Sequence, residues 1–132
     1  MSQQNVEILR HAVDASRRGE RWADVLATDF EWDHSAFPGL DMQVRGSGRE
    51  NYLQMMDRYR RAWIDYEMAV KELIDAGDDV VVTVHEKVRA RGTEMLVERD
   101  LALVWTLREG RAIRVRGYGT KHEALEAAGL RE

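Results

Sequence analysis

The sequence predicts a single α+β domain in which helices cover one face of a curved antiparallel sheet. Residues 80–118 contain three runs of alternating apolar and polar residues, separated by two turn signals. Segments with helical spacing precede this stretch and follow it, and 132 residues are enough for one hydrophobic core. Alternating runs joined by glycine-containing turns are typical of an antiparallel meander. We therefore expect one domain over residues 1–132.

The N-terminal part predicts two helices and a short strand. Asn5–Arg18 places apolar residues on one stripe, and Gly19 is a typical residue just after a helix C-terminus. Glu20–Ala27 predicts a second, short helix. Phe30–His34 then alternates as a strand does, with His34 as the polar residue in an otherwise apolar register.

A loop and a third helix lead to the first long strand. The segment Ser35–Gly46 contains the only proline and predicts a loop that borders a site. Ser47 and Glu50 have the spacing of a capping box, which predicts a helix from there to about Arg61. Ile64–Lys71 alternates and predicts a long strand.

The two turns of the meander suggest how its strands pair. Gly92-Thr93 suits a two-residue hairpin loop, and this register places Glu86 opposite Arg99. The second turn, Arg108–Gly110, suits a three-residue loop. That register places Trp105 opposite Ile113, Leu103 opposite Val115, Leu101 opposite Gly117 and Arg99 opposite Gly119. After the meander, a second capping box at Thr120–Glu123 predicts a closing helix through Ala127, ended by Gly129.

Three polar residues interrupt apolar strand registers and are the candidate site residues. Glu86 and Arg99 meet on an apolar face beside Gly117 and Gly119, which contribute no side chain, as a small-molecule cavity requires. The alternative is a purely structural ion pair that satisfies both groups inside the core. His34 is either a base or a core histidine whose hydrogen bonds are satisfied.

Composition excludes several classes of function. The net charge is −4 with interleaved signs, so we expect no nucleic-acid binding. No apolar run approaches the roughly 20 residues of a membrane helix, and the N-terminus lacks a signal-peptide pattern. Cysteine is absent, and we expect a cytoplasmic protein. No His/Asp/Glu spacing resembles a metal site, so we expect neither metal nor cofactor.

The element order and several phrases resemble the SnoaL-like branch of the nuclear transport factor 2-like superfamily. The phrases are Phe30-Glu31-Trp32, Val44–Glu50, Leu103–Arg111 and Glu123–Leu130. The resemblance implies a cone-shaped domain whose bent sheet wraps around three to four helices. It also implies a deep pocket at the wide end and, in many members, a homodimer formed through the outer face of the sheet.

Known enzymes of this fold are matched only in part. Against ketosteroid isomerase, His34 falls at the base position, while Ala12 and Leu103 fall where oxyanion donors are required, which disfavours steroid isomerisation. Against limonene epoxide hydrolase, Glu86 falls at the acid. Val84 then replaces its arginine and Gly117 its water-activating aspartate. Arg99 could replace the lost arginine from the neighbouring strand. The polyketide cyclases that name the branch are expected to use acid–base side chains in the same pocket.

The resulting hypothesis is a protein that holds a hydrophobic small molecule in a pocket. If it is an enzyme, we expect cofactor-independent acid–base chemistry (isomerase, cyclase, dehydratase or epoxide hydrolase type) with His34 as base, Glu86 as acid and Arg99 orienting Glu86 or stabilising an oxyanion. The alternative is a non-catalytic binding or dimerisation module with a structural Glu86–Arg99 pair. The expected pocket wall consists of Trp32, Met56, Tyr59, Leu101, Leu103, Trp105 and Gly117. The expected dimer face consists of Val81, Thr83, His85, Ala102, Val104 and Thr106.

Overall fold

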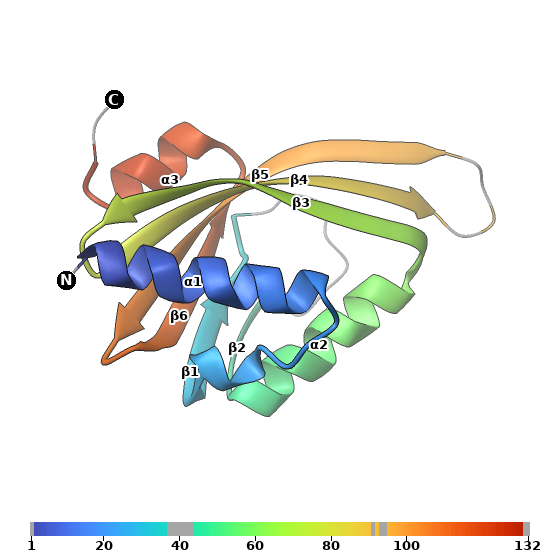
Figure 1. Cartoon of the computed structure of the whole chain (residues 1–132). Helices are drawn as coiled ribbons and strands as arrows, with labels where there is room; N and C mark the ends of the chain where they lie inside the picture. The colour runs from blue at the N-terminus through green and yellow to red at the C-terminus, as the bar shows by residue number, and fades with distance from the viewer. Residues whose placement is uncertain (1, 37–43, 91, 93–94, 131–132) are drawn as a thin grey trace.

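The chain forms one mixed six-stranded sheet with three α-helices, in strand order β2-β1-β6-β5-β4-β3 (Figure 1). The computed structural model describes residues 2–36, 44–90, 92 and 95–130. The helices are α1 (Ser2–Arg17), the 3-10 turn η1 (Ala23–Val25), α2 (Arg49–Arg61) and α3 (Lys121–Ala127). The strands are β1 (Leu26–Asp33), β2 (Arg45–Ser47), β3 (Trp63–Ala76), β4 (Asp79–Ala90), β5 (Leu96–Arg108) and β6 (Arg111–Tyr118). This confirms the predicted α+β fold with a meander over residues 80–118.

The sheet has two faces with different cover, which decides where a ligand has room. In Figure 1, α1 and α2 lie on one side of the sheet and α3 lies on the other, while β3, β4 and β5 extend as an arm. We call the α1–α2 side the concave face and the α3 side the outer face. The concave-face core buries Phe30, Trp32 and Tyr52 together with Val82 and Val84 of β4.

On the outer face, α3 covers part of the surface that was expected to form a dimer. Val81, Ala102 and Val104 pack with Ala124 and Leu125 of α3 in a second apolar cluster. These three strand residues are therefore buried within the chain itself.

The first hairpin has the register that its turn predicted. β4 and β5 pair antiparallel with Glu86 opposite Arg99 and Val84 opposite Leu101. Because side chains alternate with period two, Val84, Glu86 and their partners share the concave face. The turn residues Arg91, Thr93 and Glu94 lie outside the described residues.

The second hairpin differs from its prediction by two residues. Arg108 pairs with Arg111, so the loop is only Glu109-Gly110, and both residues have positive φ (52° and 81°), as a type I′ turn requires. A register shift between Thr106 and Leu107 then adds a bulge.

Beyond the bulge, the residues of β5 pair with β6 residues two positions later in the chain than predicted. Trp105 lies opposite Val115 rather than Ile113, and Leu103 lies opposite Gly117 rather than Val115. Because the register between β5 and β6 is shifted by two residues, an even number, the side chains of β5 point to the same face of the sheet as predicted.

Two local predictions in the first half of the chain are wrong. Only Ala23–Val25 is helical, since Leu26 is already extended and pairs with Ala112 of the parallel neighbour β6. The predicted capping box does not form because Ser47 pairs with Glu31 in the sheet, so Gly48 becomes the N-cap residue. In both places strand pairing overrides the local helical preference.

The predicted ends of α1 and α3 are confirmed. Gly19 and Gly129 both have positive φ, near 72° and 80°, as residues that follow a helix C-terminus commonly do. The hydroxyl oxygen of Thr120 accepts a hydrogen bond from the backbone N–H of Glu123 at 3.1 Å. Within the described residues, none of the helices has the length and apolar character needed to cross a bilayer.

Candidate functional site

The central feature of the concave face is a buried carboxylate with two donors on one oxygen. Glu86, on β4, is 3% exposed. Its Oε1 accepts hydrogen bonds from Arg99 Nε at 2.8 Å and from the Tyr59 hydroxyl at 3.2 Å. Arg99 Nη2 lies 2.7 Å from the same oxygen and donates to the Tyr59 hydroxyl at 2.8 Å. The three side chains therefore form a closed cluster, which we call the Glu86 cluster.

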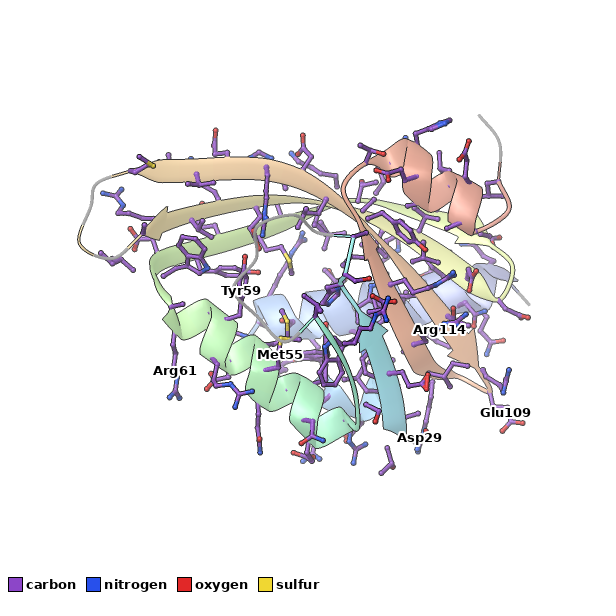
Figure 2. All side chains as sticks on the ribbon, turned by 180° about the vertical axis from the view of Figure 1, so that it is seen from behind. Asp29, Met55, Tyr59, Arg61, Glu109 and Arg114 are labelled. Atoms are coloured by element: carbon purple, nitrogen blue, oxygen red, sulfur yellow. The ribbon has the colours of Figure 1, made fainter. Side chains whose placement is uncertain are left out.

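Helix α2 supplies Tyr59 because of its apolar spacing. Tyr52, Met55 and Tyr59 are the buried residues of α2, and their spacing of three and then four residues puts them on one face. Figure 2 shows Met55 and Tyr59 between α2 and the sheet, whereas Arg61 points away from it. The sequence thus directs the hydroxyl of Tyr59 toward the sheet.

Two aromatic residues of β3 complete the surroundings of the Glu86 cluster. The rings of Tyr59 and Tyr66 meet edge to face with centroids 5.9 Å apart, and those of Tyr59 and Trp63 at 6.2 Å. Burial raises the pKa of Tyr66, and the charge of Glu86 and a hydrogen-bond interaction with it act in the same direction. Burial and the Glu86 charge raise the pKa of Tyr59 to about 12, so this phenol is protonated at neutral pH.

His34 lies in a different environment, just beyond the end of β1. It is 4% exposed, and its backbone N–H donates to the carbonyl of Val44 at 2.6 Å. Its ring centroid is 6.5 Å from that of Tyr52. Burial lowers the pKa of His34 to about 4, with a smaller opposing effect of Asp33, so the imidazole is neutral at neutral pH.

Two of the three candidate polar residues are in direct contact, and the third, His34, lies by Tyr52. Glu86 and Arg99 are in direct contact with Tyr59. His34 lies by Tyr52, and Tyr52 and Tyr59 are separated by seven residues, or about 10 Å along the axis of α2.

The expected pocket-wall residues lie on the same concave side. The apolar cluster there contains Trp32 as a buried member, and Met56, Leu101, Leu103 and Trp105 are partly buried against it. Gly117 is buried opposite Leu103 and adds no side chain above that strand.

The larger cavity found in the described structure lies elsewhere. It measures about 400 Å³ and lies between the start of α1 and the turns that contain Asp78 and Glu109. A smaller cavity of about 120 Å³ lies between α1 and β3. Neither is lined by Glu86, Arg99 or His34.

Sequence reasoning missed two contributors to these surroundings. Tyr66 lies beside the Glu86 cluster, and a signal for it was present, because Tyr66 is part of the alternating run of β3 and lies opposite Val88. Tyr52 contacts Phe30, Trp32 and His34 through its ring, and its spacing of seven from Tyr59 was the available signal.

The chemistry available at the Glu86 cluster is hydrogen bonding and proton transfer. A carboxylate, a guanidinium and a protonated phenol lie within hydrogen-bond distance of one another. Among the residues that the structure describes, no group of three or more His, Asp or Glu side chains has the geometry to hold a metal ion.

The fold is thus a mixed six-stranded sheet with helices on both faces and a polar cluster on its concave face. A family model, the SnoaL-like domain, matches residues 7–115, and the chain belongs to this family. Curated proteins gave no match to the chain.

Solved structures with the same fold include three informative ones. A nuclear transport factor 2-like protein from Burkholderia thailandensis is 20% identical with a TM-score of 0.77, covering 96% of this chain and 98% of that one. TerC, co-crystallised with polyporic acid, is 20% identical with a TM-score of 0.73 and covers 96% and 98%. A protein with a ketosteroid isomerase-like fold from Catenulispora acidiphila, in complex with trimethylamine, is 16% identical with a TM-score of 0.64 and covers 83% and 81%. At these identities the similarity establishes a shared fold.

Proposed function

We propose that this chain binds a hydrophobic small molecule on the concave face of its sheet, with the Glu86 cluster as the polar end of the site. The observation that supports this is a carboxylate only 3% exposed, in the middle of an apolar strand face and bonded to a phenol and a guanidinium. A buried charge is costly unless it is paired, so a strand face that retains one has a specific use for it, either in binding or in structure.

A second candidate is cofactor-independent acid–base catalysis at the same site, of the isomerase, cyclase, dehydratase or epoxide hydrolase type. Its support is the protonation state of His34, whose burial keeps the imidazole neutral and able to accept a proton. With a pKa of about 4, His34 is a weak base until a bound molecule changes its surroundings. In this reading Glu86 is the acid, and Arg99 orients it or stabilises an oxyanion.

The experiment that tests binding is native mass spectrometry of protein purified from its own host, followed by titration with polyporic acid. Polyporic acid is a reasonable first probe because it was co-crystallised with TerC, a protein of the same fold. We expect a retained ligand, or saturable binding that Glu86→Gln weakens at least tenfold. The matched control is Asp79→Asn, which neutralises the acid of a partly buried ion pair with Arg116.

The alternative of a non-catalytic module with a structural ion pair makes a different prediction. In that case Glu86→Gln lowers stability, while affinity for any retained ligand stays within twofold of the wild type. If the wild type, Glu86→Gln and Asp79→Asn all bind the ligand with equal affinity, the Glu86 cluster is not part of the binding site.

We further propose a cytoplasmic homodimer that uses the outer face. Family resemblance supports the dimer, and the absence of cysteine is compatible with a reducing compartment. Because α3 covers Val81, Ala102 and Val104, such an interface would include α3 itself. Light scattering at tens of micromolar tests the dimer, and a monomer mass would contradict it.

A further inference from the structure

Along the concave face, β4 and β5 differ consistently in exposure. Same-face residues pair across the two strands in this order: Val80–Trp105, Val82–Leu103, Val84–Leu101, Glu86–Arg99 and Val88–Val97. Every β4 member of these pairs is between 0% and 3% exposed. On β5, Trp105, Leu103 and Leu101 are half-buried, the Arg99 side chain is 26% exposed, and Val97 is 38% exposed.

The arrangement of the helices explains this difference. The main contacts of α1 are with β3 and β4, and those of α2 are with β1, β2 and β3. Helix α3 contacts β5, but from the outer face (Figure 1). The concave face of β5 therefore receives little cover from α1 and α2 and forms an apolar strip, Val97–Trp105, with Arg99 within it.

We propose that the ligand of this strip is an elongated molecule with an apolar arm on each side of a central hydrogen-bonding oxygen. This inference rests on the proposed binding function and adds the shape and chemical class of the ligand. The oxygen lies at Arg99 and Tyr59, where the guanidinium and the phenol are already joined. The class that fits is a diaryl compound with a central enol, hydroxyl or carbonyl group.

Strand geometry sets the size of the two arms. Val97 and Leu101 are each two residues from Arg99, and two residues span about 7 Å in a strand, which matches one aryl ring on each side of a central oxygen. Beyond Leu101, the strip continues over Leu103 and Trp105, and the Trp105 ring stacks on Phe30 at 5.7 Å. The arm on the Leu101 side therefore has the larger apolar surface.

A second copy of the chain fits this strip less well. In the segment Leu96–Leu101, the outer-face residues Glu98 and Asp100 lie at the unpaired end of β5, beyond the residues that pair with β6. An antiparallel pairing of two copies centred on Arg99 would set Glu98 of each copy opposite Asp100 of the other, which is unfavourable. Charge thus favours a small molecule over a sheet extended between copies.

The test compares two probes and two variants by isothermal titration calorimetry. Dibenzoylmethane has a central enol with two aryl arms, and benzoylacetone has the same enol with one. Val97→Gln removes the apolar surface under one arm. The matched control, Leu96→Gln, changes the neighbouring residue, which is 48% exposed and lies on the opposite face of the same strand.

In the wild type and in Leu96→Gln, we expect dibenzoylmethane to bind roughly tenfold more tightly than benzoylacetone, because the second ring buries additional apolar surface. In Val97→Gln this advantage should fall below about threefold, while the affinity for benzoylacetone changes less than twofold. Thermal unfolding of each variant checks that the fold is retained.

Several outcomes would overturn the inference. One is a second ring that adds no affinity in the wild type; binding of benzoylacetone would then leave the proposed binding function in place. Another is that Val97→Gln keeps the wild-type difference in affinity between dibenzoylmethane and benzoylacetone. A third is that Leu96→Gln loses this difference to the same extent as Val97→Gln. If neither probe binds while a retained ligand or polyporic acid does, the inference fails and the proposed function stands. If nothing binds, both fail.

Discussion

The two ends of helix α2 place two tyrosines in opposite environments. The ring of Tyr52 packs on other rings, with centroids at 4.9 Å from Phe30 and 5.5 Å from Trp32. Tyr59, on the same face of the helix, contacts the charged groups of Glu86 and Arg99. The concave face therefore has an aromatic end near His34 and an ionic end at the Glu86 cluster.

The difference shows that two similarly buried polar side chains can have very different neighbours. His34 is buried near the ring of Tyr52, and the cost of desolvation lowers its pKa until it is neutral at neutral pH. Glu86 is equally buried, but Arg99 and Tyr59 bond to its carboxylate oxygen. Substitutions at the aromatic end and at the ionic end of the concave face should therefore affect stability through different interactions and by different amounts.

The largest effect on stability is expected when Arg99, the positively charged residue of the ionic end, is replaced. Arg99→Met leaves the Glu86 carboxylate buried without its counter-ion, which should lower the free energy of unfolding by about 3 kcal/mol. Urea unfolding at pH 7 measures this loss. The double variant Glu86→Gln/Arg99→Met removes both charges and should recover at least half of it.

The matched control for that experiment is Arg116→Met. Arg116 pairs with Asp79 at 3.5 Å, and Asp79 is more exposed than Glu86 and also accepts a bond from Thr106. We expect a loss of about 1 kcal/mol or less from this variant. Equal losses of unfolding free energy in Arg99→Met and Arg116→Met would mean that the buried Glu86–Arg99 pair contributes no more to stability than the more exposed Asp79–Arg116 pair.

At the aromatic end, Gly46→Ala is expected to have the next largest effect. A Cβ atom at position 46 would overlap the ring of Trp32, which in turn packs on Tyr52. Since this overlap is with a buried ring, we expect a loss of about 2–3 kcal/mol in the free energy of unfolding. Near-ultraviolet circular dichroism should report the displaced tryptophan. An unchanged spectrum and stability would show that the ring can move without cost.

The pH dependence of stability distinguishes the two ends further. The pKa of His34 is about 4 in the folded state and about 6.5 when unfolded, so between these values the unfolded chain binds more protons. Stability should therefore fall as the pH drops from 6.5 toward 4, by about 2 kcal/mol at pH 5. His34→Gln should remove this part of the decline, as measured by urea unfolding at pH 7, 6 and 5. Parallel pH profiles for wild type and variant would contradict the neutral, buried state of His34.

The sequence predicts more of the sheet than of the site. Alternation and the Gly92 turn were enough to place Glu86 opposite Arg99, because register follows from the turn and from the face that is buried. The bulge at Thr106 and the cap at Gly48 were missed, since both depend on strand pairing with distant residues. The same limit applies to the site. Strand patterns indicated its ion pair, whereas the hydroxyl of Tyr59 reaches Glu86 only through the packing of α2 on the sheet.

The smallest effect, and the most direct comparison of the two ends, comes from removing one hydroxyl at a time. Tyr59→Phe deletes the donor to Glu86 and the acceptor for Arg99, and should cost about 1–2 kcal/mol because both charged partners lose a bond. Tyr52→Phe keeps the ring contacts with Phe30 and Trp32, and burial is the cause that raises the pKa of Tyr52. We therefore expect Tyr52→Phe to change the free energy of unfolding by less than about 0.5 kcal/mol, or to raise it slightly. Urea unfolding of both variants at pH 7 gives the two values in one experiment. A larger loss in Tyr52→Phe than in Tyr59→Phe would reverse the assignment of an aromatic and an ionic end to the concave face.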